Sequence, residues 1–186
     1  MMTDARIRYT KQAIRTSFFQ LLGYKSIEKI TVKELCDLAG INRATFYRYY
    51  ENQYDLLSII GNEMLADIKT AIQKNPNDID ALTTLMCHLL YQNRNEWVLL
   101  MSPNGDSRFL SKTINSFNQI YDPVCNTEDK QMMYRFMLNG FTGIFDYWVQ
   151  NNMQESPDQI ANYLVNFRHR LVSTNTSSHA SRNTKQ

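Results

Sequence analysis

The sequence has few of the features that mark secreted, membrane or fibrous proteins. Its 186 residues include only 3 cysteines, and Cys36, Cys87 and Cys125 are too widely spaced and odd in number for a disulfide framework. No apolar run approaches the roughly 18 residues that a membrane-spanning helix needs. The N-terminus lacks the apolar core of a secretory signal. We therefore expect a cytoplasmic protein with reduced thiols and no membrane segment.

Glycine and proline are also scarce, with 6 and 4 residues, and they fall between segments of helical periodicity. No segment shows the alternation of a half-buried strand, so the sequence predicts an all-α fold of about nine helices. The expected helices are 7–22, 31–38, 42–50, 53–74, 78–92, 94–101, 107–121, 128–152 and 157–172.

Charge divides the chain unevenly. Residues 1–50 hold nine Lys or Arg and four acidic residues, whereas the remainder carries a small negative excess. A basic end on a mildly acidic body indicates that this end meets a polyanion. We expect a DNA-binding domain over 1–52, a helical regulatory and dimerisation domain over 53–172, and a disordered tail rich in Ser, Thr and Asn over 173–186.

The second and third expected helices form a helix-turn-helix motif. Thr31 and Glu34 have the spacing of a capping box, Gly40 lies in the break, and Asn42 is a good N-cap for the next helix. The residues expected to face inward are Ile14, Phe18, Leu21 and Leu22 of the first helix and Val32, Leu35 and Leu38 of the second.

The third helix has one face for packing and another for DNA. Phe46 and Tyr50 lie four residues apart and can be buried together, whereas burying Arg43 or Arg48 would be costly. Arginine can bind guanine through two hydrogen bonds, alanine permits close approach, and hydroxyl groups reach phosphates. The outward residues expected on this helix are Arg43, Ala44, Tyr47 and Arg48, with Thr45 and Tyr49 on the flanks.

The segment 30–50, ITVKELCDLAGINRATFYRYY, followed by Tyr54-Asp55-Leu56-Leu57, resembles the DNA-binding domain of TetR-family transcriptional regulators. The resemblance implies an all-helical homodimer in which each subunit reads half of a palindromic operator on double-stranded DNA. The implied contacts are Thr31 and Lys33 with the DNA backbone, Arg43, Ala44, Tyr47 and Arg48 with bases, and Thr45 and Tyr49 with phosphates. The family has a phosphate-contacting lysine where this chain has Gln53. With Gln53 that contact is either weakened or replaced by Arg6, Arg8 or Lys11 of the N-terminal arm.

The end of the chain resembles the last two helices of a subgroup that includes dihydroxyacetone-kinase regulators, through Gly140-Phe141-Thr142-Gly143 and Ser156-Pro157-Asp158-Gln159. In the family these helices form the dimer interface. Gly140 and Gly143 would let a second backbone approach, although they could instead relieve crowding within one subunit. The implied interface residues are Gly140, Gly143, Tyr147, Ile160, Leu164 and Phe167.

We find no catalytic constellation and expect neither an enzyme nor a metal or cofactor. Cys87 and His88 are adjacent on a helix and point about 100° apart, so they cannot share a proton. Aromatic and methionine residues between 91 and 148, Phe109 and Phe136 among them, are expected mostly in the core. Some could line a pocket for a small apolar or aromatic effector. The candidate pocket residues are Tyr91, Trp97, Met101, Phe117, Tyr121, Met133 and Met137.

The leading hypothesis is a homodimeric repressor that an unknown effector releases from its operator. The alternative is a regulator, either an adaptor or an activator, whose body recognises a protein partner and has no small-molecule pocket. A third reading, an enzyme on a helical bundle, would require catalytic residues that the sequence does not offer.

Overall fold

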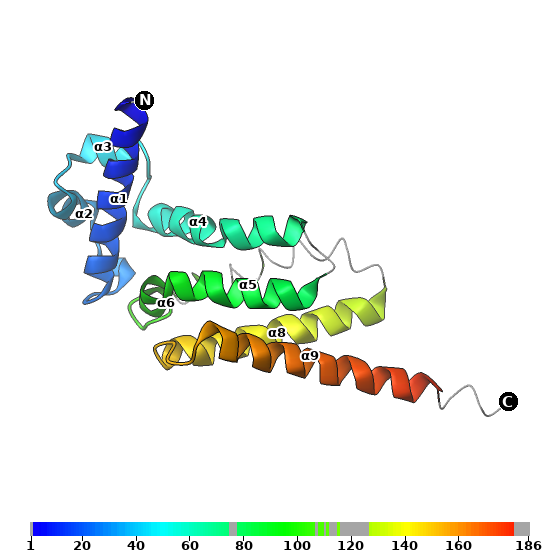
Figure 1. Cartoon of the computed structure of the whole chain (residues 1–186). Helices are drawn as coiled ribbons and strands as arrows, with labels where there is room; N and C mark the ends of the chain where they lie inside the picture. The colour runs from blue at the N-terminus through cyan, green and yellow to red at the C-terminus, as the bar shows by residue number, and fades with distance from the viewer. Residues whose placement is uncertain are drawn as a thin grey trace. The chain divides into compact units, whose positions relative to one another are not determined.

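The structure is a computed structural model, which describes residues 2–74, 78–106, 108, 109, 111, 115 and 127–180. All regular elements within these residues are helices, which confirms the expected all-α class (Figure 1). The α-helices are α1 (Met2–Leu22), α2 (Val32–Ala39), α3 (Arg43–Tyr47), α4 (Gln53–Lys74), α5 (Ile79–Gln92), α6 (Arg94–Leu100), α8 (Glu128–Gln150) and α9 (Pro157–Ala180), with one short 3-10 helix, η1 (Ile27–Lys29). Most of the helix expected over 107–121 lies outside the described residues.

Two compact units share the chain. The first comprises Met1–Ala66 and Asn93–Gln119, and the second comprises Asp67–Gln92 and Ile120–Gln186. The first unit thus contains α1, α2, α3, the first part of α4 and α6, and the expected division at residue 52 stays a prediction. Contact with α1 places α6 in this unit.

The hydrophobic centre of the first unit lies between α1 and the short helices α2 and α3. The four residues expected to face inward from α1 are all buried, as are Phe46 and Tyr50 after the turn. In α2 the expectation was wrong at one position, because Leu38 is 43% exposed and Cys36 is buried in its place. Leu35 and Cys36 are buried, and Leu38 lies about 200° around the helix from Cys36.

Local sequence signals set the ends of these helices. Thr31 and Glu34 form the expected capping box, and Gly40 ends α2 in the left-handed region at a φ of 65°. The Asn42 side chain accepts a hydrogen bond from the Thr45 amide at 2.8 Å and so caps α3. Satisfied first-turn amides therefore fix the entry to both helices of the helix-turn-helix motif.

Polar contacts join α6 and the loop after it to α1. Arg15 of α1 forms ion pairs with Glu96 of α6 and Glu63 of α4. The Asn104 side chain donates to the Leu22 carbonyl at 3.0 Å, and the Asn104 carbonyl accepts from the Ile27 amide at 2.9 Å. The loop therefore supplies hydrogen-bond partners where α1 leaves its last carbonyls unsatisfied.

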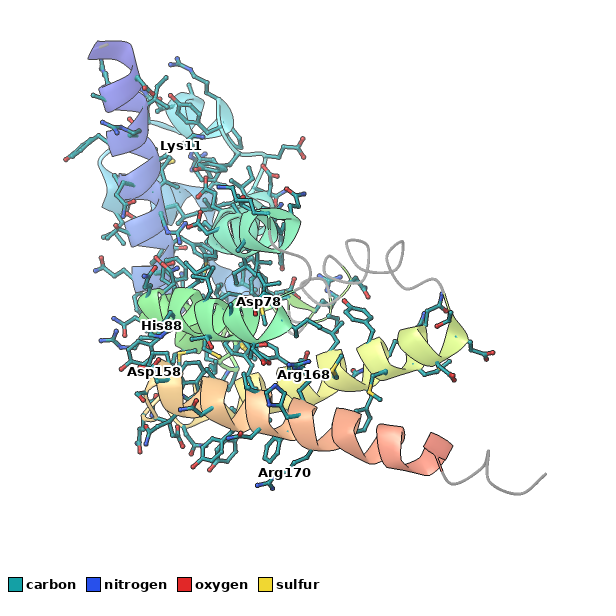
Figure 2. The ribbon with its side chains drawn as sticks, turned by 45° about the vertical axis from the view of Figure 1, so that its right-hand side comes forward. Lys11, Asp78, His88, Asp158, Arg168 and Arg170 are labelled. Atoms are coloured by element: carbon teal, nitrogen blue, oxygen red, sulfur yellow. The ribbon has the colours of Figure 1, made fainter. Side chains whose placement is uncertain are left out.

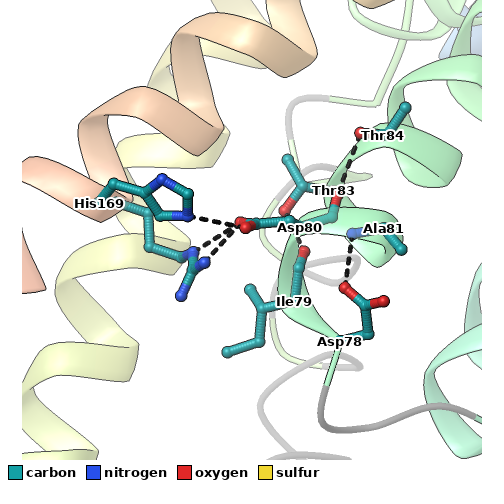
Figure 3. Close-up of polar contacts among 8 residues, drawn as sticks. Asp78, Ile79, Asp80, Ala81, Thr83, Thr84 and His169 are labelled. Carbon is teal, nitrogen blue, oxygen red and sulfur yellow. Dashed lines mark hydrogen bonds and ion pairs between the residues drawn. The ribbon is translucent and has the colours of Figure 1, made fainter.

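In the second unit, α5 packs along α9. Asp80 of α5 accepts hydrogen bonds from Arg168 at 2.6 and 2.9 Å and from His169 at 2.7 Å (Figure 3). Nearer the other end of α5, His88 Nε2 lies 2.9 Å from Asp158 Oδ1 (Figure 2). These polar contacts join α5 to α9 at two points along their contact.

Several helix ends differ from the sequence-based expectation. Helix α1 begins at Met2 rather than near residue 7, α3 ends at Tyr47 rather than residue 50, and α9 continues to Ala180 rather than ending near 172. Residues 173–180 of the expected disordered tail are thus helical, and 181–186 lie outside the described residues. Ser, Thr and Asn are poor helix formers, but without Pro or Gly they can extend a helix that tertiary packing has already nucleated.

Candidate nucleic-acid interface

The outward face of α3 carries the residues expected to read DNA. Arg43, Ala44 and Arg48 are exposed, and Tyr47 is 57% exposed. Phe46, beneath them, is fully buried and packs edge-on against Tyr47 with ring centroids 5.7 Å apart. One short helix therefore presents two guanidinium groups, a phenol and a small residue to solvent from a rigid base.

Thr45 and Tyr49 flank this face and are half-buried. The Thr45 hydroxyl lies 2.9 Å from Asn42 Oδ1, which also caps the helix. Since an amide oxygen can only accept, the Thr45 hydroxyl proton is already donated. The ring of Tyr49 packs near that of Tyr50, with centroids 6.3 Å apart, so Tyr49 is held against the buried side of the motif.

Thr31 and Lys33, at the start of α2, differ in whether their hydrogen-bond donors are available to bind DNA. Both donors of Thr31, the amide and the hydroxyl, point to Glu34 Oε2 at 3.0 and 2.7 Å. Lys33 is exposed. The two residues that the sequence pattern treated alike therefore differ, because Thr31 completes the cap and Lys33 extends to solvent.

Glu34 is the charged centre of this cap. Its carboxylate lies 2.5 Å from Lys25 Nζ, and the hydrogen bond from Lys25, followed by those from Thr31, lowers the pKa of Glu34 to about 2. The carboxylate is therefore ionised under any physiological condition. Its negative charge at the start of α2 also interacts favourably with the positive end of the helix dipole.

The residues expected at a dimer interface do not all lie on one surface. Gly140, Gly143 and Tyr147 follow one exposed face of α8, and a Cβ atom built at either glycine meets no atom of the described chain within 4 Å. Phe167 of α9 is exposed and Leu164 is half-buried. Ile160 is 4% exposed and belongs to the core of its own chain.

Sequence analysis missed several large apolar residues on the same faces. On α8, Met132 and Phe136 lie in the helical row of the two glycines, and Phe136, expected in the core, is 59% exposed. On α9, Tyr163 and Leu171 are exposed in the row of Phe167. A spacing of three and four residues from the glycines could have identified this row. The alternative role of the glycines, relief of crowding inside one subunit, has no neighbouring atom to support it among the described residues.

The candidate pocket residues are divided between the two units of the chain. Trp97 is buried in the first unit, where its ring packs at 5.8 Å from Phe109, and Met101 follows α6. Tyr91 stacks on Trp148 in the second unit, with ring centroids 5.8 Å apart. Met133 and Met137 are half-buried on α8. Phe117 and Tyr121 lie outside the described residues.

The described residues contain no cluster of three or more His, Cys, Asp or Glu side chains that could hold a metal ion. Cys87 is buried, and burial, with a smaller effect from Asp158, raises the pKa of its thiol to about 12, so it is a poor nucleophile. Its neighbour His88 faces Asp158 instead. No helix among the residues that the structure places is long and apolar enough to cross a bilayer.

Residues 77–170 match the TetR-type family model described as "Transcriptional regulator C-terminal region". The chain therefore belongs to the TetR family of transcriptional regulators, whose members bind DNA and dimerise. It is a regulator rather than an enzyme.

A curated relative in this family is the HTH-type dhaKLM operon transcriptional activator DhaS of Lactococcus lactis subsp. lactis strain IL1403. It is 26% identical over 131 residues, which span 68% of this chain and 66% of the relative. The resemblance to the DhaS subgroup is thus confirmed.

Solved structures show the same fold. A TetR regulator from Streptococcus agalactiae 2603V has a TM-score of 0.65 at 22% identity, with 90% of this chain and 97% of that chain covered. The dihydroxyacetone kinase operon activator DhaS has a TM-score of 0.60 at 18% identity, with 89% and 97% covered. The fatty acid degradation regulator FadR from Bacillus halodurans has a TM-score of 0.64 at 12% identity, with 83% and 92% covered.

Proposed function

We propose that this protein is a homodimeric, sequence-specific DNA-binding regulator whose α3 helices enter successive major grooves of a palindromic operator. The observation that carries the proposal is the exposed surface of α3. Two arginines and a tyrosine face solvent there, although the helix has buried aromatic residues directly beneath them. With Tyr47 57% exposed, the isolated fold gains only part of the burial energy of this side chain, whereas a groove would cover more of the ring.

The exposed residues divide by chemistry. Arg43 follows the N-cap of α3 and can donate two hydrogen bonds to guanine O6 and N7. Ala44 can contact a thymine methyl group, and Tyr47 and Arg48 extend the reading face by another turn. At the start of α2, Lys33 is the proposed phosphate contact, whereas Thr31 acts mainly by holding the cap, since its donors point to Glu34.

Thr45 and Tyr49 are proposed to contact the backbone on either side of that face. Thr45 would have to turn its hydroxyl proton from Asn42 toward a phosphate oxygen, because both of these oxygens only accept. Tyr49 is half-buried, and its hydroxyl makes no hydrogen bond among the described residues, so it can donate without such a change. We therefore expect Tyr49 to contribute more than Thr45.

A second subunit is proposed to cover the exposed face of α8 and α9. A row of large apolar side chains is costly to leave exposed to water, and a Cβ atom added at either of the two glycines beside it meets no atom of the described residues within 4 Å. A symmetric dimer buries the same patch on both copies and fixes the separation of the two heads. Two α3 helices about 34–36 Å apart match one turn of DNA.

The test begins with selection of bound duplexes from random or genomic fragments, using the full-length protein at about 0.15 M salt. A recovered palindrome supports the proposal, and no preference over random duplex refutes it. Arg43→Ala should then cost about 1–3 kcal/mol and relax selection at one position per half-site. Lys33→Ala should weaken all duplexes alike and reduce the salt dependence. Equal effects of both variants would refute the assigned roles.

The direction of regulation has two candidates. Repression, with release by an effector, is the first proposal, since a bound dimer can block a promoter and a small rotation of the subunits can separate the heads. Activation is the second, because the 26% identical relative is described as an activator. In vitro transcription from the selected operator distinguishes them: transcript falls with added protein in the first case and rises in the second.

The body then responds either to a small effector or to a protein partner. A small apolar or aromatic effector should raise the melting temperature by mass action across a metabolite panel. If no metabolite does so while a partner protein alters operator binding, the adaptor hypothesis is favoured. An effector must bind the non-operator state more tightly, since equal affinity would shift nothing.

A further inference from the structure

Lys11 of α1 lies beside Tyr49, which follows α3, and has no acidic partner among the described residues. Lys11 Nζ is 5.8 Å from the centre of the Tyr49 ring, within the range of a cation–π contact. Figure 2 shows Lys11 on α1. Its side chain is half-buried, yet within the described residues no carboxylate lies within 4.0 Å of it. The ring thus attracts the ammonium group itself, which keeps its hydrogen-bond donors.

The next cation along the same face of α1 is used differently. Arg15 follows Lys11 by four residues, about 40° around the helix, so both point to the same side. Arg15 forms ion pairs with Glu63 and Glu96 and is thus neutralised within the fold. Arg15 therefore has a structural role, whereas Lys11 remains available to bind an anion from outside the chain.

Two further cations, Arg6 and Arg8, precede Lys11 on α1, and helical geometry places them on different sides of the helix. Arg8 lies three residues before Lys11, about 60° away on the same side, and is exposed. Arg6 lies five residues before Lys11, about 140° away, and therefore points elsewhere. Helix α1 begins at Met2, so Arg8 and Lys11 are fixed on a helix rather than on a flexible arm.

We infer that Lys11, positioned by the ring of Tyr49 and extended by Arg8, is a phosphate-binding residue of the DNA interface. This inference rests on the proposed function, since the anion it would meet is the operator backbone. Tyr49 would then have two roles: its hydroxyl donates to phosphate, and its ring directs the neighbouring ammonium group. A phosphate contact supplies affinity for every duplex and no base preference.

The experiment measures binding of the full-length protein to a random-sequence duplex of about 30 base pairs, by fluorescence anisotropy between 0.05 and 0.2 M salt. Each lost phosphate contact should make the slope of log K against log salt less negative by about 0.9. Lys11→Gln should produce this change in each DNA-binding head, which at 0.15 M salt weakens binding about fivefold per head. Lys11→Arg should keep the slope. The matched control is Lys69→Gln, another half-buried helical lysine, which should leave the slope unchanged.

Variants of Tyr49 test the positioning role. Lys11→Gln should have its full effect in a Tyr49→Phe background, which keeps the ring, and a smaller effect with Tyr49→Leu, which removes it. Equal effects in both backgrounds would overturn the role of the ring. A wild-type slope in Lys11→Gln, while the wild-type protein still binds DNA, would overturn the phosphate assignment alone. Absence of salt-dependent binding by the wild-type protein would instead refute the proposed function.

Discussion

The two glycines of α8 give opposite expectations for the stability of one chain and the stability of a dimer. Gly140 and Gly143 are exposed on one face of a 23-residue helix, and a Cβ atom added at either position meets no described atom within 4 Å. The double variant Gly140→Ala/Gly143→Ala therefore adds two methyl groups without a clash inside the chain. If a second α8 packs on this face, the same methyl groups enter a close contact between backbones.

The magnitudes follow from helix propensity and packing. Alanine is favoured over glycine inside a helix by about 0.5–1 kcal/mol, so the pair should stabilise the isolated chain by about 1–2 kcal/mol. In a symmetric dimer four methyl groups enter the interface, and overpacking of this kind costs about 1–3 kcal/mol. Since 1.4 kcal/mol is a factor of ten in affinity, this cost should raise the dimer dissociation constant by about 5- to 150-fold.

Sedimentation velocity over nanomolar to micromolar concentrations measures the dimer dissociation constant, and thermal unfolding below that constant measures the single chain. The melting temperature of the single chain should rise while the dimer weakens. Asn62→Ala, at an exposed position of α4, is the control, because it raises helix propensity without adding a group to this face. It should leave the dimer constant unchanged.

A double variant that dimerises as tightly as wild type, or more tightly, would refute the reasoning that these glycines permit a close contact. A single chain that loses stability would show that the added methyl groups clash within the subunit, which is the alternative role considered for the glycines.

Two further predictions concern ionic contacts. Because the pKa of Glu34 is lowered to about 2, its contribution to stability is present above the ordinary value of 4.5 and is lost as the pH falls through 2. Urea unfolding of Glu34→Gln should therefore show a deficit at pH 7 that vanishes toward pH 2, and a pH-independent deficit would contradict this cause. Burial opposes ionisation of Asp80, but hydrogen bonds from Arg168 and His169 outweigh it and hold the pKa of that carboxyl below its usual range. Asp80→Asn should lower the free energy of unfolding at pH 7 by about 1 kcal/mol after screening by solvent, and unchanged stability would mean that α5 and α9 do not depend on this contact.

Local sequence signals predicted the N-terminal motif closely. The capping box at Thr31, the Asn42 cap and the left-handed Gly40 are determined by residues within one or two turns, so no distant contact had to be known. Burial of Phe46 and Tyr50 followed from their spacing of four residues. A second capping pair, Ser156 and Gln159, exchanges hydrogen bonds at the start of α9 and is equally local.

Predictions failed where burial depended on distant parts of the chain. Leu38 and Phe136 are apolar at helical spacing, and the sequence placed both in the core, yet no described neighbour covers them enough to bury them. Ile160 has the same chemistry as the exposed residues of α9 but points into its own subunit. Periodicity gives the width of an apolar stripe, but the position of neighbouring helices decides which part of that stripe is covered.

The sequence by itself determined the all-α class, the helix-turn-helix motif and the outward side chains of α3, because propensity, capping and periodicity act over a few residues. Tertiary structure alone decided that Arg15 forms ion pairs with two carboxylates, whereas Lys11, one turn away, contacts the Tyr49 ring and can bind an anion from outside the chain. Glu63 and Glu96 are separated from Arg15 by 48 and 81 residues, and only folding brings such charges within reach of one another.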